Sequence, residues 1–163
     1  MARYNSKVTT VTFEDGTTPT ALSITAGPGP GDLTIGETNA ENAELIRVMD
    51  RGTFDGHVEG DDLEQEWSLT IGLRDETITE AAADRIRDFI VKAGNFSAAI
   101  STGPDPDIHT FKMIVEMVRN GKTSTITLPV CAARMAFAEA VEGNTLAVSG
   151  TNNGAWTVTS ATA

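Results

Sequence analysis

The chain has 163 residues and a net charge of −11, from 12 Lys and Arg against 23 Asp and Glu. A protein that grips duplex nucleic acid needs clustered basic residues to displace counterions, so this acidic excess argues against stable DNA binding. No apolar run approaches the roughly 20 residues that span a bilayer, so we expect no membrane insertion, and residues 1–163 are expected to form one domain.

The first third of the chain predicts short strands. Val8 to Phe13 and Thr20 to Ala26 are rich in β-branched and apolar residues and predict two strands. Glu14-Asp15-Gly16 predicts a turn, and the two strands are expected to form a hairpin with a loop that includes Pro19. Gly27 to Gly31 alternates glycine with proline and predicts a loop. Asn42 to Met49 predicts a strand, with a short helix as the alternative.

The segment Asp50 to Asp62, DRGTFDGHVEGDD, predicts a long polar loop between two strands. Its three glycines are spaced four apart, and only Phe54 and Val58 are apolar. Loops this long are uncommon in compact domains unless they bind something or are disordered. We therefore expect either a loop that contacts a neighbouring molecule through Phe54 and Val58, or a disordered surface loop.

A strand and a single helix are predicted next. Trp67 to Leu73 alternates large apolar with small or polar residues, as a half-buried strand does. Thr77 as N-cap with Glu80 in a capping box, followed by a helical stripe of apolar residues, predicts a helix over residues 77–93. Gly94 is expected to end this helix in the left-handed conformation.

The remainder is predicted to be β. Asn120-Gly121 is a strong hairpin signal, and Pro129 implies a bulge or an edge within a run too long for one flat strand. The predicted strands are Phe96 to Ile100, Ile108 to Val118, Thr123 to Phe137, and a final hairpin of Thr145 to Gly150 with Trp156 to Ser160. Together these elements predict a mainly β fold, a β-sandwich or barrel-like sheet with one flanking helix.

No constellation of residues indicates catalysis. His57 and His109 are far apart in the sequence, and the acidic run from Asp61 to Glu66 lacks the spacing of an EF-hand. Cys131 lies in an apolar run and is expected to be a buried, inert thiol. We therefore expect no enzyme activity, no metal and no cofactor.

The order of these parts resembles that of the major tail tube proteins of long-tailed bacteriophages. The resemblance rests on a strand ending in Val48-Met49-Asp50-Arg51-Gly52, the loop through Gly56 and Gly60-Asp61-Asp62, the strand Glu66 to Leu73 and the single helix after it. It implies a non-catalytic subunit made in the host bacterial cytoplasm and placed in the virion tail. The type VI secretion tube protein shares this fold and stays an alternative.

The resemblance also implies partners and sites. Six copies would close a ring, and rings would stack into a tube that ends at a tail terminator, encloses a tape measure protein and lets double-stranded DNA pass without stable binding. The loop between rings would carry Asp50, Arg51, Phe54, Asp55, His57, Val58, Asp61 and Asp62. A negative lumen would prevent DNA from sticking to the wall, and Glu14, Asp15 and Glu142 are the candidate lumen carboxylates.

Three other readings stay open on the sequence. A tail terminator or a head-decoration protein would have a similar architecture and would also be a virion component. A carbohydrate- or calcium-binding β-sandwich module belongs to a different functional class. Electron microscopy of the purified protein, a glycan array and a calcium titration separate these classes.

Overall fold

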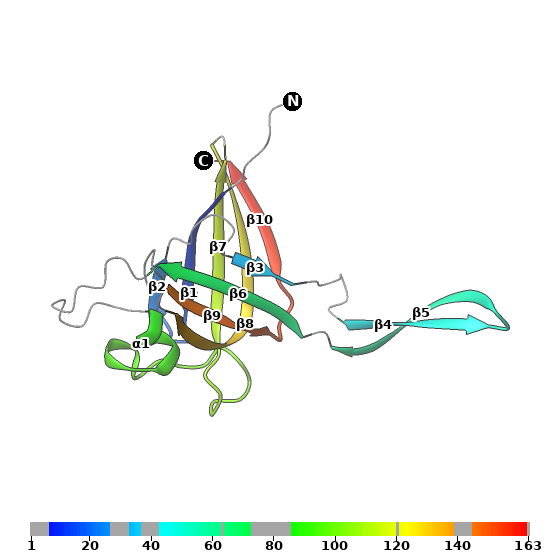
Figure 1. Cartoon of the computed structure of the whole chain (residues 1–163), viewed down its shortest axis with the longest axis horizontal. Coiled ribbons are helices and arrows are strands. Elements are labelled where there is room, and N and C mark those ends of the chain that lie inside the picture. The colour runs from blue at the N-terminus through cyan, green and yellow to red at the C-terminus, as the bar shows by residue number, and fades with distance from the viewer. Residues whose placement is uncertain are drawn as a thin grey trace.

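The computed structural model describes residues 7–26, 33–36, 43–62, 64–72, 86–119, 121–138 and 145–162. It confirms the predicted mainly β, sandwich-like fold, which consists of one large antiparallel sheet and a second, two-stranded sheet (Figure 1). The large sheet has the strand order β2-β1-β7-β8-β9-β6-β3, with β10 also paired to β8, and the small sheet is β4-β5. The strands are β1 (Lys7–Glu14), β2 (Ser23–Ala26), β3 (Leu33–Ile35), β4 (Ala43–Asp50), β5 (Thr53–Asp62), β6 (Gln65–Gly72), β7 (Phe111–Arg119), β8 (Lys122–Ala138), β9 (Thr145–Asn152) and β10 (Thr157–Thr162).

The long strand β8 joins the two layers of the sandwich. Along one edge of β8, β10 pairs as far as Thr127 and β9 pairs from Cys131 onward. Pro129 lies in the gap, where the register against β7 also shifts. Proline has no N–H to donate, so the ladder must be interrupted there. The predicted bulge at Pro129 is confirmed.

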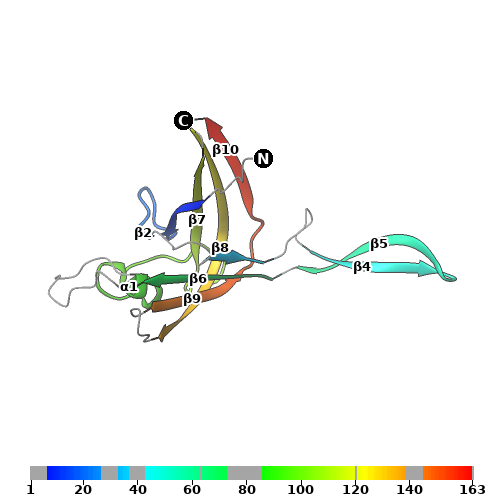
Figure 2. The ribbon, with the colours of Figure 1, turned by 45° about the horizontal axis from the view of Figure 1, so that its top comes forward.

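The core fills the space where strands β1 and β7 cross strands β6 and β9 (Figure 2). Phe13 is at its centre, with its ring centroid 5.0 Å from that of Phe111 and 6.1 Å from that of Trp67. The helix α1 (Ile86–Val91) adds Phe89, whose ring centroid is 6.0 Å from that of Phe13. This short helix therefore closes the core instead of lying on a solvated surface.

Two of the predicted hairpins are present. β1 pairs with β2, and β7 pairs with β8 through Arg119 and Lys122, which flank the predicted Asn120-Gly121 turn. The predicted terminal hairpin is wrong, because β9 and β10 do not pair with each other. Both pair with β8, and residues 153–156 carry the chain across the gap at Pro129 instead of reversing it.

Other expectations change near the helix. The start predicted at Thr77 and Glu80, like the loop at 27–31, lies outside the described residues. The helix ends at Val91 and not at the predicted residue 93, because Lys92 already has a left-handed φ of 54°. Gly94 has the predicted left-handed conformation, with φ of 56°, but it begins the next segment. The strand predicted at Phe96 to Ile100 is also wrong, since a 3₁₀ helix η1 (Gly94–Phe96) and turns occupy this segment. Within the described residues, no helix has the length and apolar character needed to cross a membrane.

Candidate functional site

Strands β4 and β5 form a hairpin that projects from the sandwich, and we call residues 43–62 the arm (Figures 1 and 2). The strand predicted at 42–49 is confirmed, whereas the long loop predicted at 50–62 is wrong, because β5 occupies most of it. At about 3.3 Å per residue, the ten residues of β5 reach roughly 30 Å. The arm is therefore a regular element and not an irregular loop.

The glycines that suggested a loop have specific places in this hairpin. Arg51 and Gly52 have φ values of 46° and 83° and form a two-residue turn between the paired residues Asp50 and Thr53. Gly56, with φ of 142°, lies where the register shifts and leaves Asp55 as an extra residue. Glycine suits such a bulge because it has no Cβ. These glycines thus twist the hairpin instead of interrupting it.

One face of the arm carries an aromatic cluster. The guanidinium carbon of Arg47 lies 5.4 Å from the ring centroid of Phe54, and the rings of Phe54 and His57 meet edge to face at 5.1 Å. Leu45 and Met49 share this face, because they alternate with residues of the other face along β4. This face is therefore apolar at its centre and positively charged at one point.

The opposite face of the arm is also apolar. Ile46 pairs with Val58, and the Ile46 side chain lies over Gly60, where an added Cβ would meet it at 3.0 Å. The five large apolar side chains of the two faces are 43–55% exposed: Leu45, Ile46, Met49, Phe54 and Val58. A two-stranded hairpin is marginally stable alone, so burial of these side chains against another molecule would stabilise the arm.

A buried polar network holds the root of the arm. Gly36, which precedes the arm, donates its N–H to Glu66 O at 2.7 Å and accepts a hydrogen bond from Gln65 Nε2 at 3.0 Å. Gln65 Oε1 in turn accepts from Asn152 Nδ2 at 3.2 Å, and Asn152 Oδ1 accepts from Val130 N at 3.2 Å. Gln65 and Asn152 are both buried. Sequence reasoning missed them, because an amide side chain in a strand gives no signal of burial.

The residues predicted for the loop between rings all lie on the arm. The predicted lumen carboxylates differ from one another in exposure and in ion pairing. Asp50, Arg51, Asp55, Asp61 and Asp62 are exposed along the arm. In the large sheet, Glu14 Oε2 lies 2.6 Å from Lys112 Nζ, which offsets its charge. The prediction of Asp15 as a lumen carboxylate is wrong, because this residue is only 4% exposed. Glu142 is outside the described residues.

The Asp15 carboxylate joins the β1–β2 turn to the segment after the helix. Its Oδ1 accepts from the amides of Leu22 at 2.7 Å and Thr17 at 3.1 Å, and its Oδ2 accepts from the Ile100 amide at 3.0 Å and from the Thr17 hydroxyl. Burial alone would raise the pKa of this carboxyl, but these hydrogen bonds to the charged form outweigh it and lower the pKa. Asp15 is therefore a buried, structural carboxylate.

The outer face of the layer β2-β1-β7-β8-β10 is dominated by threonine. Cross-strand pairs align Thr25, Thr12, Ile114, Thr127 and Thr157 in one row, and Thr10, Glu116, Thr125 and Thr159 in the next. We call these two rows the threonine face. The Thr10 hydroxyl donates to Glu116 Oε2 at 3.3 Å, and Glu116 is exposed. Sequence reasoning did not select Glu116, although the alternation in residues 111–118 already placed it opposite the core side chains.

The two histidines and the cysteine, which were considered for catalysis or metal binding, do not lie together in one site. His57 is on the arm, while His109 Nε2 lies 3.0 Å from Phe89 O beside the helix. Burial lowers the pKa of His109, so its imidazole is held neutral. Cys131 is buried as predicted, and burial raises the pKa of its thiol to about 12. Among the described residues, no three His, Cys, Asp or Glu side chains gather into a metal site.

Comparison with known proteins gives no information on function, so a function must be argued from the structure itself. No protein-family model matches the sequence, and no curated protein matches it. The features that bear on function are thus the arm and the threonine face.

Proposed function

We propose that this chain is a structural subunit that assembles with copies of itself into stacked rings, forming a tube of the bacteriophage tail type. Double-stranded DNA would pass through the tube without stable binding, and the subunit would have no catalytic role. The observation that carries the proposal is the arm, a regular hairpin about 30 Å long with exposed apolar side chains on both faces. Such an element gains most of its stability only when other molecules cover it.

The open edges of the sheet support ring closure. Among the residues that the structure describes, β10 pairs with β8 alone, and its sequence TVTSAT holds no charge and no proline. Residues 7–10 of β1 pair with β7 but lie beyond the reach of β2. Isolated proteins usually protect such edges with charge, proline or bulges. The β10 edge has neither charge nor proline, whereas the β1 edge has one register shift, between Val8 and Thr10. Joining the β10 edge of one subunit to the β1 edge of the next is a head-to-tail contact, which closes into a ring when the rotation allows.

The threonine face is the proposed lumen surface. It spans the same strands whose edges would join, so ring closure would carry it around the inside of the barrel. Its hydroxyl groups carry no charge that could pair with phosphate, and Glu116 adds one carboxylate per subunit that repels it. This surface would let DNA slide more readily than bind.

The test is negative-stain electron microscopy of the purified protein, native and with Val58→Asp. We expect rings or hollow tubes from the native protein and their loss in the variant, because the new carboxylate would be buried at the contact. Ile108→Asp is the matched control, since Ile108 is 54% exposed and Val58 is 55% exposed, but Ile108 is not on the arm. Both variants should keep the native circular dichroism spectrum.

The same experiment separates the alternatives. Native protein that stays dispersed at high concentration would contradict the proposal. Single rings that never stack would favour a tail terminator instead. Tubes formed equally well by Val58→Asp would show that the arm is not a contact.

A further inference from the structure

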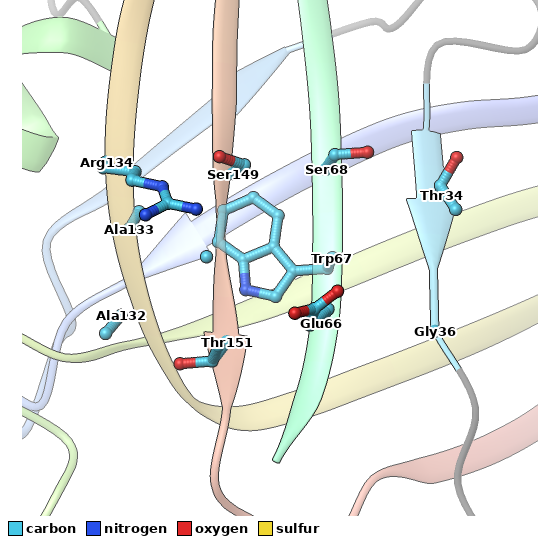
Figure 3. Close-up of a pocket in the computed structure, with 11 residues that line it drawn as sticks. Thr34, Gly36, Glu66, Trp67, Ser68, Ala132, Ala133, Arg134, Ser149 and Thr151 are labelled. Atoms are coloured by element: carbon cyan, nitrogen blue, oxygen red, sulfur yellow. The ribbon is translucent and has the colours of Figure 1, made fainter.

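An open groove lies on the outer face of the other layer, away from the threonine face. It crosses strands β8, β9, β6 and β3 and has a volume of about 460 Å³ (Figure 3). Trp67, which is only 2% exposed, lies at the bottom of the groove. Most of the other side chains along its floor are short: Ala132, Ser149, Thr151, Ser68 and Thr34. Such side chains leave the strands open to close approach by another backbone.

Two opposite charges flank this floor. Arg134 stands beside Ser149 in the β8–β9 ladder, and Glu66 stands beside Thr151 in the β6–β9 ladder. Both are exposed, and neither forms an ion pair with another described residue. They lie on strands that are two apart and are offset by two residues along them, so their backbones are separated by roughly 12 Å. The groove therefore offers one positive and one negative contact across a floor of small side chains.

The tip of the arm presents the complementary pattern. Asp50 and Arg51 are adjacent and exposed at the two-residue turn, and they form no ion pair with a described residue. The arm as a whole carries six carboxylates against two guanidinium groups. An acidic arm needs an acceptor with a cation, and Arg134 is a cation set in a groove.

We infer that this groove is the acceptor for the arm tip of a second copy of the chain. In this contact Asp50 pairs with Arg134, Arg51 pairs with Glu66, and the glycine turn rests on the small side chains between them. The inference rests on the proposed function, because it names the surface that receives the arm. It also gives a role to the short side chains that lie between Arg134 and Glu66.

The experiment reverses the charge of Arg134 and then exchanges the charges of Asp50 and Arg134. Assembly is measured by sedimentation and electron microscopy. Arg134→Glu should raise the concentration needed for assembly roughly tenfold or more, a change of about 1.4 kcal/mol at the lower limit. The double variant Asp50→Arg with Arg134→Glu restores the pairing of opposite charges and should recover most of the native assembly. Lys122→Glu is the control, since it makes the same change of charge at an exposed residue outside the groove.

The outcomes separate this inference from the proposed function. If the native protein forms tubes and Arg134→Glu forms them equally well, the groove is not the acceptor, while the tube proposal stands. If Arg134→Glu fails and the double variant does not recover, the pairing of Asp50 with Arg134 is wrong. If the native protein forms no rings or tubes, the proposed function itself fails. Circular dichroism of each variant excludes misfolding as the cause.

Discussion

Asn152 Nδ2 donates a hydrogen bond of 3.2 Å to Gln65 Oε1, and both side chains are buried beside the root of the arm. Asn152 also accepts from Val130 N and donates to Gly154 O at 2.7 Å. One amide thus connects β9, β6 and the bulge in β8. Buried polar groups contribute stability only when they are paired, so this network should be sensitive to the loss of a single member.

Replacing Asn152 with alanine should lower the free energy of unfolding by roughly 2 to 4 kcal/mol, because it leaves several buried polar groups unpaired. Urea unfolding followed by tryptophan fluorescence measures the change. Asn153→Ala is the control, since Asn153 is exposed and bonds through its backbone N–H. Equal effects of the two substitutions would show that the network adds little to stability.

Asp15→Asn should lower the free energy of unfolding by roughly 2 to 3 kcal/mol at neutral pH, because a neutral amide accepts the four hydrogen bonds poorly. The folded pKa of Asp15 is below its ordinary value of 3.8. The stability from this carboxylate is therefore present above about pH 4 and is lost as the pH falls through the lower folded pKa. The native protein and the variant should differ at pH 7 and converge in acid.

Thermal unfolding between pH 2 and pH 7 measures this convergence. Asp107→Asn removes a carboxylate from an exposed turn and should leave the profile unchanged. A constant difference between native protein and Asp15→Asn across the range would contradict the structural role of the charge.

Gly150→Ala should destabilise the subunit by roughly 3 kcal/mol or more, since an added methyl group would overpack the contact between β8 and β9. A Cβ at this position would lie 1.7 Å from the carbonyl oxygen of Ala132, which is backbone and cannot rotate away. Differential scanning calorimetry gives the change in melting temperature. Ser149→Ala, one residue away with a side chain on the open face, should change it little. Native-like melting of Gly150→Ala would mean that the strands can separate without cost.

A pair of proline substitutions tests the edge of β10. Successive N–H groups in a strand point to opposite sides, so one of Thr159→Pro and Ser160→Pro removes a bond to β8 and the other removes an outward donor. The variant that loses the outward donor should keep the fold but form no rings, because the neighbouring subunit loses its partner. Analytical ultracentrifugation and circular dichroism distinguish the two. Rings formed by a folded proline variant would argue against closure through this edge.

The sequence predicted the parts of the fold that depend on local pattern. The alternation from Phe111 to Val118 identified a core strand, and Asn120-Gly121 identified its hairpin, because both signals arise within a few residues. The bulge at Pro129 was also predictable, because proline cannot donate to a ladder.

The predictions failed where the structure of a segment depends on residues that are distant in the sequence. Gly56 favours a loop and a bulge equally until its pairing with Val48 is known. β9 and β10 look like a hairpin in the sequence, but β8 is long enough to pair with both of them. Asp15 looks like an ordinary turn residue, and its burial depends on the Ile100 amide, which is 85 residues away.

The continuity of β8 has a mechanical consequence. Its 17 residues run from the layer that bears the threonine face to the layer that bears Arg134. Tension applied at one layer would therefore reach the other along covalent backbone, without relying on side-chain packing to transmit it. A tube built from such subunits would stretch as a chain of stiff links, with compliance concentrated in the arms between them.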